Sequence, residues 1–143
     1  MVRPGHDDMT IERGNVPGLA EPPGYVHFAS VSGARLAFLA GQVPLDEQGE
    51  LVGAGDPVAQ TRQCLANLGA TLRAVHAGPQ DVVRTTIYVV AADQQDMGRV
   101  WRTVLESDLA DVAKTAATLV GVARLGYEGQ LVEIEVTAAV AGP

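Results

Sequence analysis

The strongest candidate for a reactive group in this sequence is Glu133, which lies in the segment Leu131–Ala139. Apolar and polar residues alternate strictly from Val132 to Thr137, which is the period of a β-strand with one buried face. A carboxylate between apolar neighbours could hold or activate a water molecule. The alternative interpretation is a solvated glutamate on an exposed sheet face.

The sequence carries no signature of metal, nucleotide or serine-hydrolase chemistry. It has no phosphate-binding loop, no dinucleotide glycine pattern, no His-x-x-x-His pair and no Gly-x-Ser-x-Gly elbow. The histidines His6, His27 and His76 lie far apart and are interpreted as structural or exposed, although His27 could reach the same pocket as Tyr25. Cys64 is the only cysteine, so it cannot form an intramolecular disulfide and is interpreted as a small core residue.

The composition predicts one globular domain with neither a nucleic-acid nor a membrane partner. A chain of 143 residues is long enough for one core. The formal charge of −7, with Lys114 as the only lysine, would repel phosphates. No apolar run approaches the length of a bilayer span, and Met1–Asp8 lacks the hydrophobic core of a signal peptide. A cytoplasmic location is therefore expected.

The first part of the chain divides into an arm and the start of a domain. Residues 1–24 are rich in Gly, Pro and charge and are predicted to form an N-terminal arm without regular structure. A single domain is predicted over residues 25–143. Tyr25–Phe28 and Arg35–Ala40 are predicted to be short strands that pair as a first hairpin around Ser32–Ala34.

Periodicity predicts two helices. The first begins at the N-cap Asp56 with Pro57 in the first helical position, and it ends at Gly78–Pro79. The second begins near Asp93, and its apolar stripe includes Trp101, which is interpreted as a core or interface residue.

Three further segments predict the remaining strands. Asp81–Val90 is rich in β-branched and aromatic residues and is predicted to be a central strand. Thr115–Gly126 and Leu131–Ala139 are expected to pair as a terminal hairpin across a Gly-bearing break. The order ββ-α-β-α-ββ predicts an α+β fold in which both helices cover one face of a mainly antiparallel sheet.

The second face of that sheet is expected to be covered too. On the predicted pairing it carries Leu119 and Ala123 as well as Glu133 and Glu135. Other copies of the same chain are the simplest cover. A cleft shared between copies would be a natural place for Glu133.

Several segments together resemble the RidA (YjgF, "endoribonuclease L-PSP") family over about Gly24–Ala139. They are Ala40–Asp46, Gln60–Leu68, Asp81–Val89, and Val122–Leu125 followed by Val132–Glu135. The resemblance implies a chorismate-mutase-like fold of the bacillus type. It also implies a homotrimer with a central barrel and small-molecule clefts between subunits. Archetypal members hydrolyse 2-imino and enamino acids to 2-keto acids and ammonia with no cofactor or metal.

The sequence departs from the deaminating members of that family at the anion clamp. Their Pro-Ala-Arg-Ser segment supplies an arginine that binds the substrate carboxylate through a two-pronged charged hydrogen bond. Aligned without gaps from Val122, that arginine position is Ala117, and the family's cysteine, serine and asparagine positions are Leu119, Ala40 and, approximately, Trp101. The candidate catalytic residues Tyr25 and Glu133 match. The implied cleft consists of Tyr25, Ala40, Gly41, Trp101, Ala117, Leu119 and Glu133.

Four functions stay open at this point. The first is a homotrimer whose clefts bind, and could hydrolyse, a small neutral or apolar carbonyl or imine compound. The second is a true 2-iminoacid deaminase that finds its carboxylate clamp elsewhere. The third is a non-catalytic binding or chaperone-like trimer, and the fourth is a ribonuclease. If the chain is an enzyme, the resemblance implies a cofactor-independent imine or enamine hydrolase.

Overall fold

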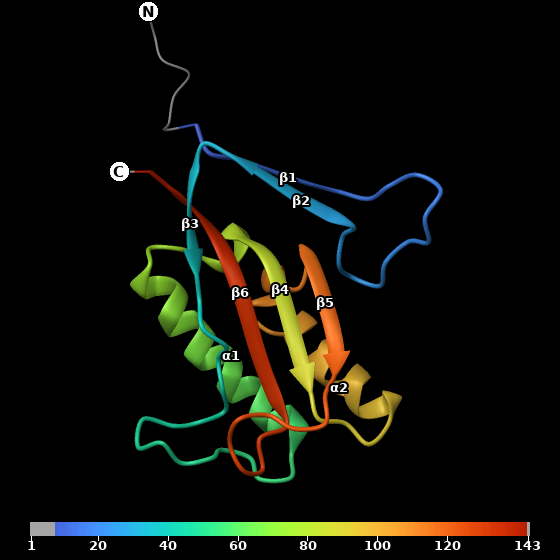
Figure 1. Cartoon of the computed structure of the whole chain (residues 1–143), viewed down its shortest axis with the longest axis vertical. Helices are drawn as coiled ribbons and strands as arrows, with labels where there is room; N and C mark the ends of the chain where they lie inside the picture. The colour runs from blue at the N-terminus through green and yellow to red at the C-terminus, as the bar shows by residue number, and fades with distance from the viewer. Residues whose placement is uncertain (1–7, 143) are drawn as a thin grey trace, which may run out of the picture.

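The computed structural model describes residues 8–142, and Figure 1 shows a twisted sheet with both helices on one of its faces. The main sheet has the order β3 (Ala34–Phe38), β6 (Val132–Ala141), β4 (Val82–Val89) and β5 (Ala116–Gly121). The helices are α1 (Pro57–Ala74) and α2 (Gln94–Leu105), and short 3-10 turns span Pro79–Asp81 and Ala110–Val112. The predicted α+β fold class is confirmed.

Strand β4 is the central strand that its β-branched residues predicted. It pairs antiparallel with β6 and parallel with β5. Thr85, Ile87 and Val89 are fully buried on the side that the helices cover. Because side chains alternate along a strand, Arg84 and Tyr88 point to the opposite face.

The predicted terminal hairpin is wrong, because β4 lies between β5 and β6. The segment between these two strands, residues 122–131, is longer than the usual hairpin loop of about two to five residues. It carries the chain past the end of β4 to the strand on its other side (Figure 1).

The predicted first hairpin is also wrong. Strand β2 (Phe28–Ser32) pairs with β1 (Thr10–Gly14) in a separate two-stranded sheet, whereas β3 pairs with β6. Only Gly33 lies between β2 and β3, and one residue cannot reverse a chain as a hairpin does. Strand β1 falls within the segment that was predicted to lack regular structure, and residues 1–7 of that segment lie outside the described residues.

The register across β4 fixes which side chains share a face. Ile87 is opposite Leu119 on the side of the helices, whereas Tyr88 is opposite Glu133 on the other side. The prediction that Leu119 shares a face with Glu133 is therefore wrong, because it assumed that β5 and β6 pair directly. Ala123 lies beyond the end of β5, outside any strand.

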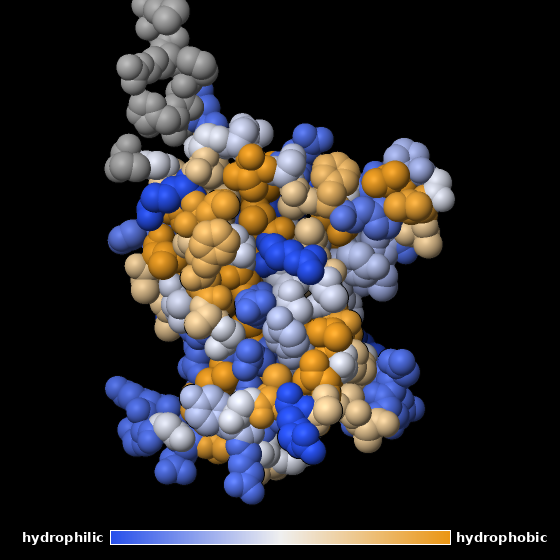
Figure 2. All heavy atoms as spheres, viewed as in Figure 1, coloured by the Kyte–Doolittle hydropathy of each residue, from blue (hydrophilic) through white to orange (hydrophobic). Residues whose placement is uncertain are grey.

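The face turned away from the helices is polar in the middle and apolar over one edge. Figure 2 shows apolar side chains gathered over β3 and the neighbouring part of β6. On β3, Phe38 is 77% exposed and Leu36 is 47% exposed. In the middle, Tyr88 Oη donates to Glu135 Oε1 at 3.1 Å. In residues 8–142, neither helix is long and apolar enough to cross a membrane.

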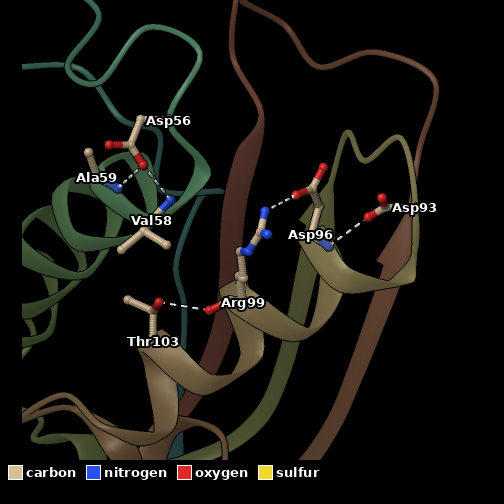
Figure 3. A network of polar contacts seen from close by, with 7 residues as sticks. All are labelled: Asp56, Val58, Ala59, Asp93, Asp96, Arg99 and Thr103. Atoms are coloured by element: carbon tan, nitrogen blue, oxygen red, sulfur yellow. Dashed lines mark hydrogen bonds and ion pairs between the residues drawn. The ribbon is translucent and has the colours of Figure 1, made fainter.

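Both helices begin at the predicted aspartates (Figure 3). Asp56 Oδ1 accepts hydrogen bonds from the N–H groups of Val58 at 3.1 Å and Ala59 at 3.0 Å. Asp93 Oδ1 accepts one from the N–H of Asp96 at 3.0 Å. These bonds satisfy amides that have no acceptor within the helix, so the predicted N-cap Asp56 and the predicted helix start near Asp93 are confirmed.

Helix α1 ends before the predicted boundary at Gly78–Pro79. The N–H of Ala77 donates to the carbonyl of Leu72 at 2.9 Å, and the N–H of His76 donates to that of Arg73 at 3.0 Å. This pair of bonds is the Schellman arrangement, which requires a left-handed residue after the cap. That residue is His76, with φ 62°.

We expect His76→Gly to raise the free energy of unfolding by about 0.5–1 kcal/mol. A side chain in the left-handed region costs about 1–2 kcal/mol, and glycine avoids that strain but gives up entropy on folding. Urea denaturation monitored by circular dichroism measures the difference. His76→Ala is the control, since it removes the ring but keeps Cβ; an equal gain in the control would contradict the backbone explanation.

Candidate functional site

Glu133 is half-buried on β6, and its carboxylate is held from one side by Gln130, which is 3% exposed. Gln130 Nε2 donates to Glu133 Oε1 at 3.2 Å and to the carbonyl of Val132 at 3.0 Å. Gln130 Oε1 accepts from the N–H of Tyr127 at 3.1 Å. These partners fix which way the amide points, so Glu133 is anchored rather than freely solvated.

The other oxygen of Glu133 lies directly against Gly41. A Cβ atom at Gly41 would overlap Glu133 Oε2 and would lie 2.6 Å from the carboxyl carbon. The close approach is held by a bridge in which Gln42 and Ile134 exchange N–H···O bonds of 2.7 and 3.1 Å. Ala40 precedes this bridge, and its carbonyl accepts from Gln42 Nε2 at 2.8 Å. Ala40, Gly41 and Glu133 therefore form one group, which we call the Glu133 group.

Cys64 lies behind this group and is not a nucleophile. It is fully buried on α1, and its Sγ donates to the carbonyl of Val132 at 3.5 Å. Burial, and to a smaller extent the negative charge of Glu133, raise the pKa of the Cys64 thiol to about 12. A thiol reacts as its thiolate, so the interpretation of Cys64 as a core residue is supported.

Gln60, also fully buried on α1, ties together the two loops that flank the Glu133 group. Its Nε2 donates to the carbonyls of Gly53 at 3.1 Å and Gly129 at 3.0 Å, and its Oε1 accepts from the N–H of Leu131 at 2.7 Å. Sequence reasoning missed both Gln60 and Gln130. The only available signal for Gln60 was an amide next to Thr61 on the apolar stripe of the helix.

A second group of predicted residues lines a cavity of about 320 Å³, which we call the Trp101 cavity. Its lining residues are Pro23, Tyr25, Trp101, Ala117, Thr118 and Leu119. The rings of Tyr25 and Trp101 are T-shaped, with centroids 6.2 Å apart and planes at 81°. Trp101 Nε1 donates to the carbonyl of Pro23 at 2.9 Å, which holds the indole of α2 against the segment before β2.

Within one chain the predicted cleft is thus divided into two groups. Ala117 and Leu119 lie on β5 opposite Thr85 and Ile87, so they face the helices, and Glu133 faces away on a strand beyond β4. No residue of the Glu133 group lines the Trp101 cavity. That the two groups act together stays a prediction.

No lysine or arginine among the described residues lines the Trp101 cavity. Arg84 comes near from the opposite face, where its Nη2 donates to Thr118 Oγ1 at 3.0 Å. Arg35 lies on β3, at the other edge of the sheet. His27 is occupied elsewhere: its Nδ1 accepts from the N–H of Val16 at 3.0 Å, and its Nε2 lies 3.1 Å from the carbonyl of Ala20.

Comparisons with known proteins agree with this fold. A RutC family protein of Pyrococcus horikoshii is 34% identical over 110 residues, which are 76% of this chain and 82% of the relative. The mouse protein 2-iminobutanoate/2-iminopropanoate deaminase is 37% identical over 113 residues, which are 76% of each chain. The crystal structure of YyfB, a Rid family protein of Yersinia pestis, superposes with a TM-score of 0.81 at 34% identity and covers 91% of this chain and 98% of YyfB.

The sequence model described as Endoribonuclease L-PSP matches residues 19–140, which include β2, β3, both helices and all of the residues predicted for the cleft. With the relatives above, this match settles the resemblance inferred from the sequence: the chain belongs to the Endoribonuclease L-PSP family, whose members include the Rid (YjgF) and RutC proteins.

Proposed function

We propose that this chain forms a homotrimer whose clefts between subunits bind small neutral carbonyl or imine compounds and hydrolyse the imines, and that it is not an efficient 2-iminoacid deaminase. The observation that carries the proposal is the anchored carboxylate of Glu133. Gln130 occupies its Oε1 at 3.2 Å, and Oε2 lies over Gly41.

Assembly explains why the predicted cleft is divided in one chain. A cleft between two copies would combine the Glu133 group of one with the Trp101 cavity of the next. The exposed Leu36 and Phe38 on β3 give the open face of the sheet an apolar edge that another copy would cover.

In this cleft Glu133 would hold the water and Tyr25 would donate a hydrogen bond to the bound compound. The water oxygen forms a bond to the imine carbon as Glu133 takes the water proton. That proton passes to the nitrogen and gives a carbinolamine. Glu133 then takes the proton of the new hydroxyl and delivers it to the nitrogen as the C–N bond breaks, which leaves a carbonyl compound and an amine or ammonia. The acidic charge of −7 disfavours RNA as the substrate.

A second candidate, 2-iminoacid deamination, is favoured by one relative and one contact. The mouse relative carries that activity in its name. Arg84 reaches Thr118, a lining residue of the Trp101 cavity, although it does so from the opposite face of the sheet. To bind a carboxylate inside the cavity, the Arg84 guanidinium would have to reach past the edge strand β5 to the other face of the sheet. The neutral substrate class is therefore preferred.

The test measures how fast the protein hydrolyses a freshly generated neutral imine while semicarbazide captures the same imine. Light scattering on the same samples gives the oligomeric state. We expect a trimer, and we expect the protein to hydrolyse the imine faster than semicarbazide captures it. Glu133→Gln should lower the rate by about 10²–10⁴, because a positioned general base contributes about that much. Glu135→Gln is the matched control, since Glu135 lies two residues along the same strand on the same face and bonds Tyr88.

Each alternative has its own outcome. A monomer at micromolar concentration would contradict the shared cleft. A wild-type rate no faster than hydrolysis without protein would leave a binding protein without catalysis, and a faster rate that Glu133→Gln does not change would remove the role of Glu133. Rapid release of keto acid from a 2-iminoacid, lost in Arg84→Ala, would establish the deaminase instead.

A further inference from the structure

The Trp101 cavity has the shape and chemistry of a site for an aromatic ring. We propose that it takes a neutral ligand made of one aromatic ring with a short carbonyl-bearing substituent. This inference rests on the proposed function, because it specifies the substrate class of the same cleft.

Two aromatic side chains form a corner in this cavity. Tyr25 and Trp101 meet edge to face at 81° with centroids 6.2 Å apart. A third ring placed in such a corner can stack offset on one face and meet the other ring edge-on, which are the two favoured geometries for aromatic pairs. An aliphatic group of equal size would gain the apolar contact but not the aromatic geometry.

The polar groups of the cavity leave one evident hydrogen-bond donor for a ligand. The indole N–H of Trp101 is already engaged by the carbonyl of Pro23 at 2.9 Å. The side chain of Thr118 is on the other face of the sheet from Ala117 and Leu119, where its hydroxyl accepts from Arg84, so it is not directed at a ligand between the two rings and that apolar floor. Among the lining side chains this leaves the Tyr25 phenol to donate to a carbonyl oxygen on the substituent.

The lining also disfavours a charged ligand. Its described side chains include no lysine, arginine, aspartate or glutamate, and Ala117 and Leu119 form an apolar floor. A carboxylate placed there would lose its hydration without gaining a charged partner. An ammonium would find no carboxylate in this wall, and the Glu133 carboxylate that the proposed cleft adds from the next copy already accepts from Gln130.

The cavity is large enough for the proposed ligand. Its volume of about 320 Å³ is roughly twice that of the cavity of about 150 Å³ that holds a benzene in an engineered protein. The remaining space suits a short substituent reaching toward Tyr25. The volume lies at the lower end of the range of about 300–1,000 Å³ for ligand pockets, which favours one ring with a short substituent over a larger ligand.

The test titrates the intact protein with three isosteric probes: benzamide, which is neutral, benzoate and benzamidinium. Trp101 is the only tryptophan, so its indole N–H gives a single side-chain resonance that reports on this cavity. We expect benzamide to shift that resonance and to bind at least tenfold more tightly than either charged probe. Cyclohexanecarboxamide should bind about two- to tenfold more weakly than benzamide, because it cannot form aromatic pairs.

Variants separate the aromatic contribution from general packing. Trp101→Leu should abolish the preference for benzamide over cyclohexanecarboxamide, measured by calorimetry, and Trp101→Phe should retain most of it. If Trp101→Leu does not fold, the comparison of the four probes on the wild-type protein still decides the question.

Several results would overturn the inference. They are benzoate binding as tightly as benzamide, benzamidinium binding most tightly, cyclohexanecarboxamide matching benzamide, or no shift of the indole resonance at millimolar probe. Benzamide is not an imine, so its binding needs no turnover. Glu133-dependent hydrolysis of aliphatic imines without benzamide binding would remove this inference and keep the proposed function. Benzamide binding without any imine hydrolysis would keep the aromatic ligand and remove the proposed hydrolysis.

Discussion

Gln60→Leu should lower the free energy of unfolding by about 2–4 kcal/mol. The side chain is fully buried, and its replacement removes the partners of the Leu131 N–H and of the Gly53 and Gly129 carbonyls. A backbone group left without a partner costs about 1–3 kcal/mol when buried, and less where water can reach it. The loss is a large fraction of the total stability of a small domain, which is about 5–15 kcal/mol.

Urea denaturation of the two proteins measures this difference, with Gln95→Leu as the matched control. Gln95 is exposed on α2, so the same substitution there should change stability by no more than about 0.5 kcal/mol. At low urea, where Gln60→Leu is still folded, we also expect a reduced Glu133-dependent rate, because Gln60 holds the loops that flank the Glu133 group. Equal unfolding midpoints for wild type and Gln60→Leu would show that these loops are held by other contacts.

Local signals in the sequence predicted the helices and the central strand well. Asp56 and Pro57 place a side-chain acceptor and a fixed φ at one helix start, and both effects act within a few residues. The end of α1 was missed, because His76 adopts a left-handed conformation that glycine usually supplies.

Strand partners could not be predicted in the same way. Alternation shows that β6 has a buried face, but it does not tell which strand lies beside it. The sequence predicts a hairpin turn at the break after Gly126, whereas the structure places β4 between β5 and β6. Because the predicted pairing is wrong, the prediction that Leu119 shares a sheet face with Glu133 is wrong too.

The candidate site was predictable in its principal residues and not in their supports. Glu133 stood out by its place in the strand, and Gly41 by the resemblance to a family. Gln60 acts across a long sequence separation, 71 residues in its bond with Leu131. Gln130 bonds residues only two or three positions away, but these bonds depend on how the loop before β6 folds. No pattern in a single sequence predicts such bonds.

We expect Ala117→Arg to raise the affinity of the Trp101 cavity for a carboxylate by about tenfold to a hundredfold. A charge-assisted hydrogen bond from arginine is worth about 1.5–3 kcal/mol, which corresponds to that range. Ala117 lies on β5 on the same side as Leu119, and both line the cavity, so the guanidinium would project into it. Glu133 of the same chain cannot draw it away, because that carboxylate lies beyond β4 on the opposite face.

Leu119→Cys should enlarge this gain, since the isobutyl group beside Ala117 takes up space that the arginine needs. Benzoate titration measures affinity, and release of keto acid from a fresh 2-iminoacid measures turnover, which Glu133→Ala should remove. Ala116→Arg is the matched control: it adds the same charge one residue before Ala117, on the opposite face and outside the cavity lining, and should give no gain. If Ala117→Arg and the double variant both form trimers and neither gains affinity or turnover, the divergence extends to Ala40 and Trp101. The loss of one arginine would then not explain what separates this chain from deaminating relatives.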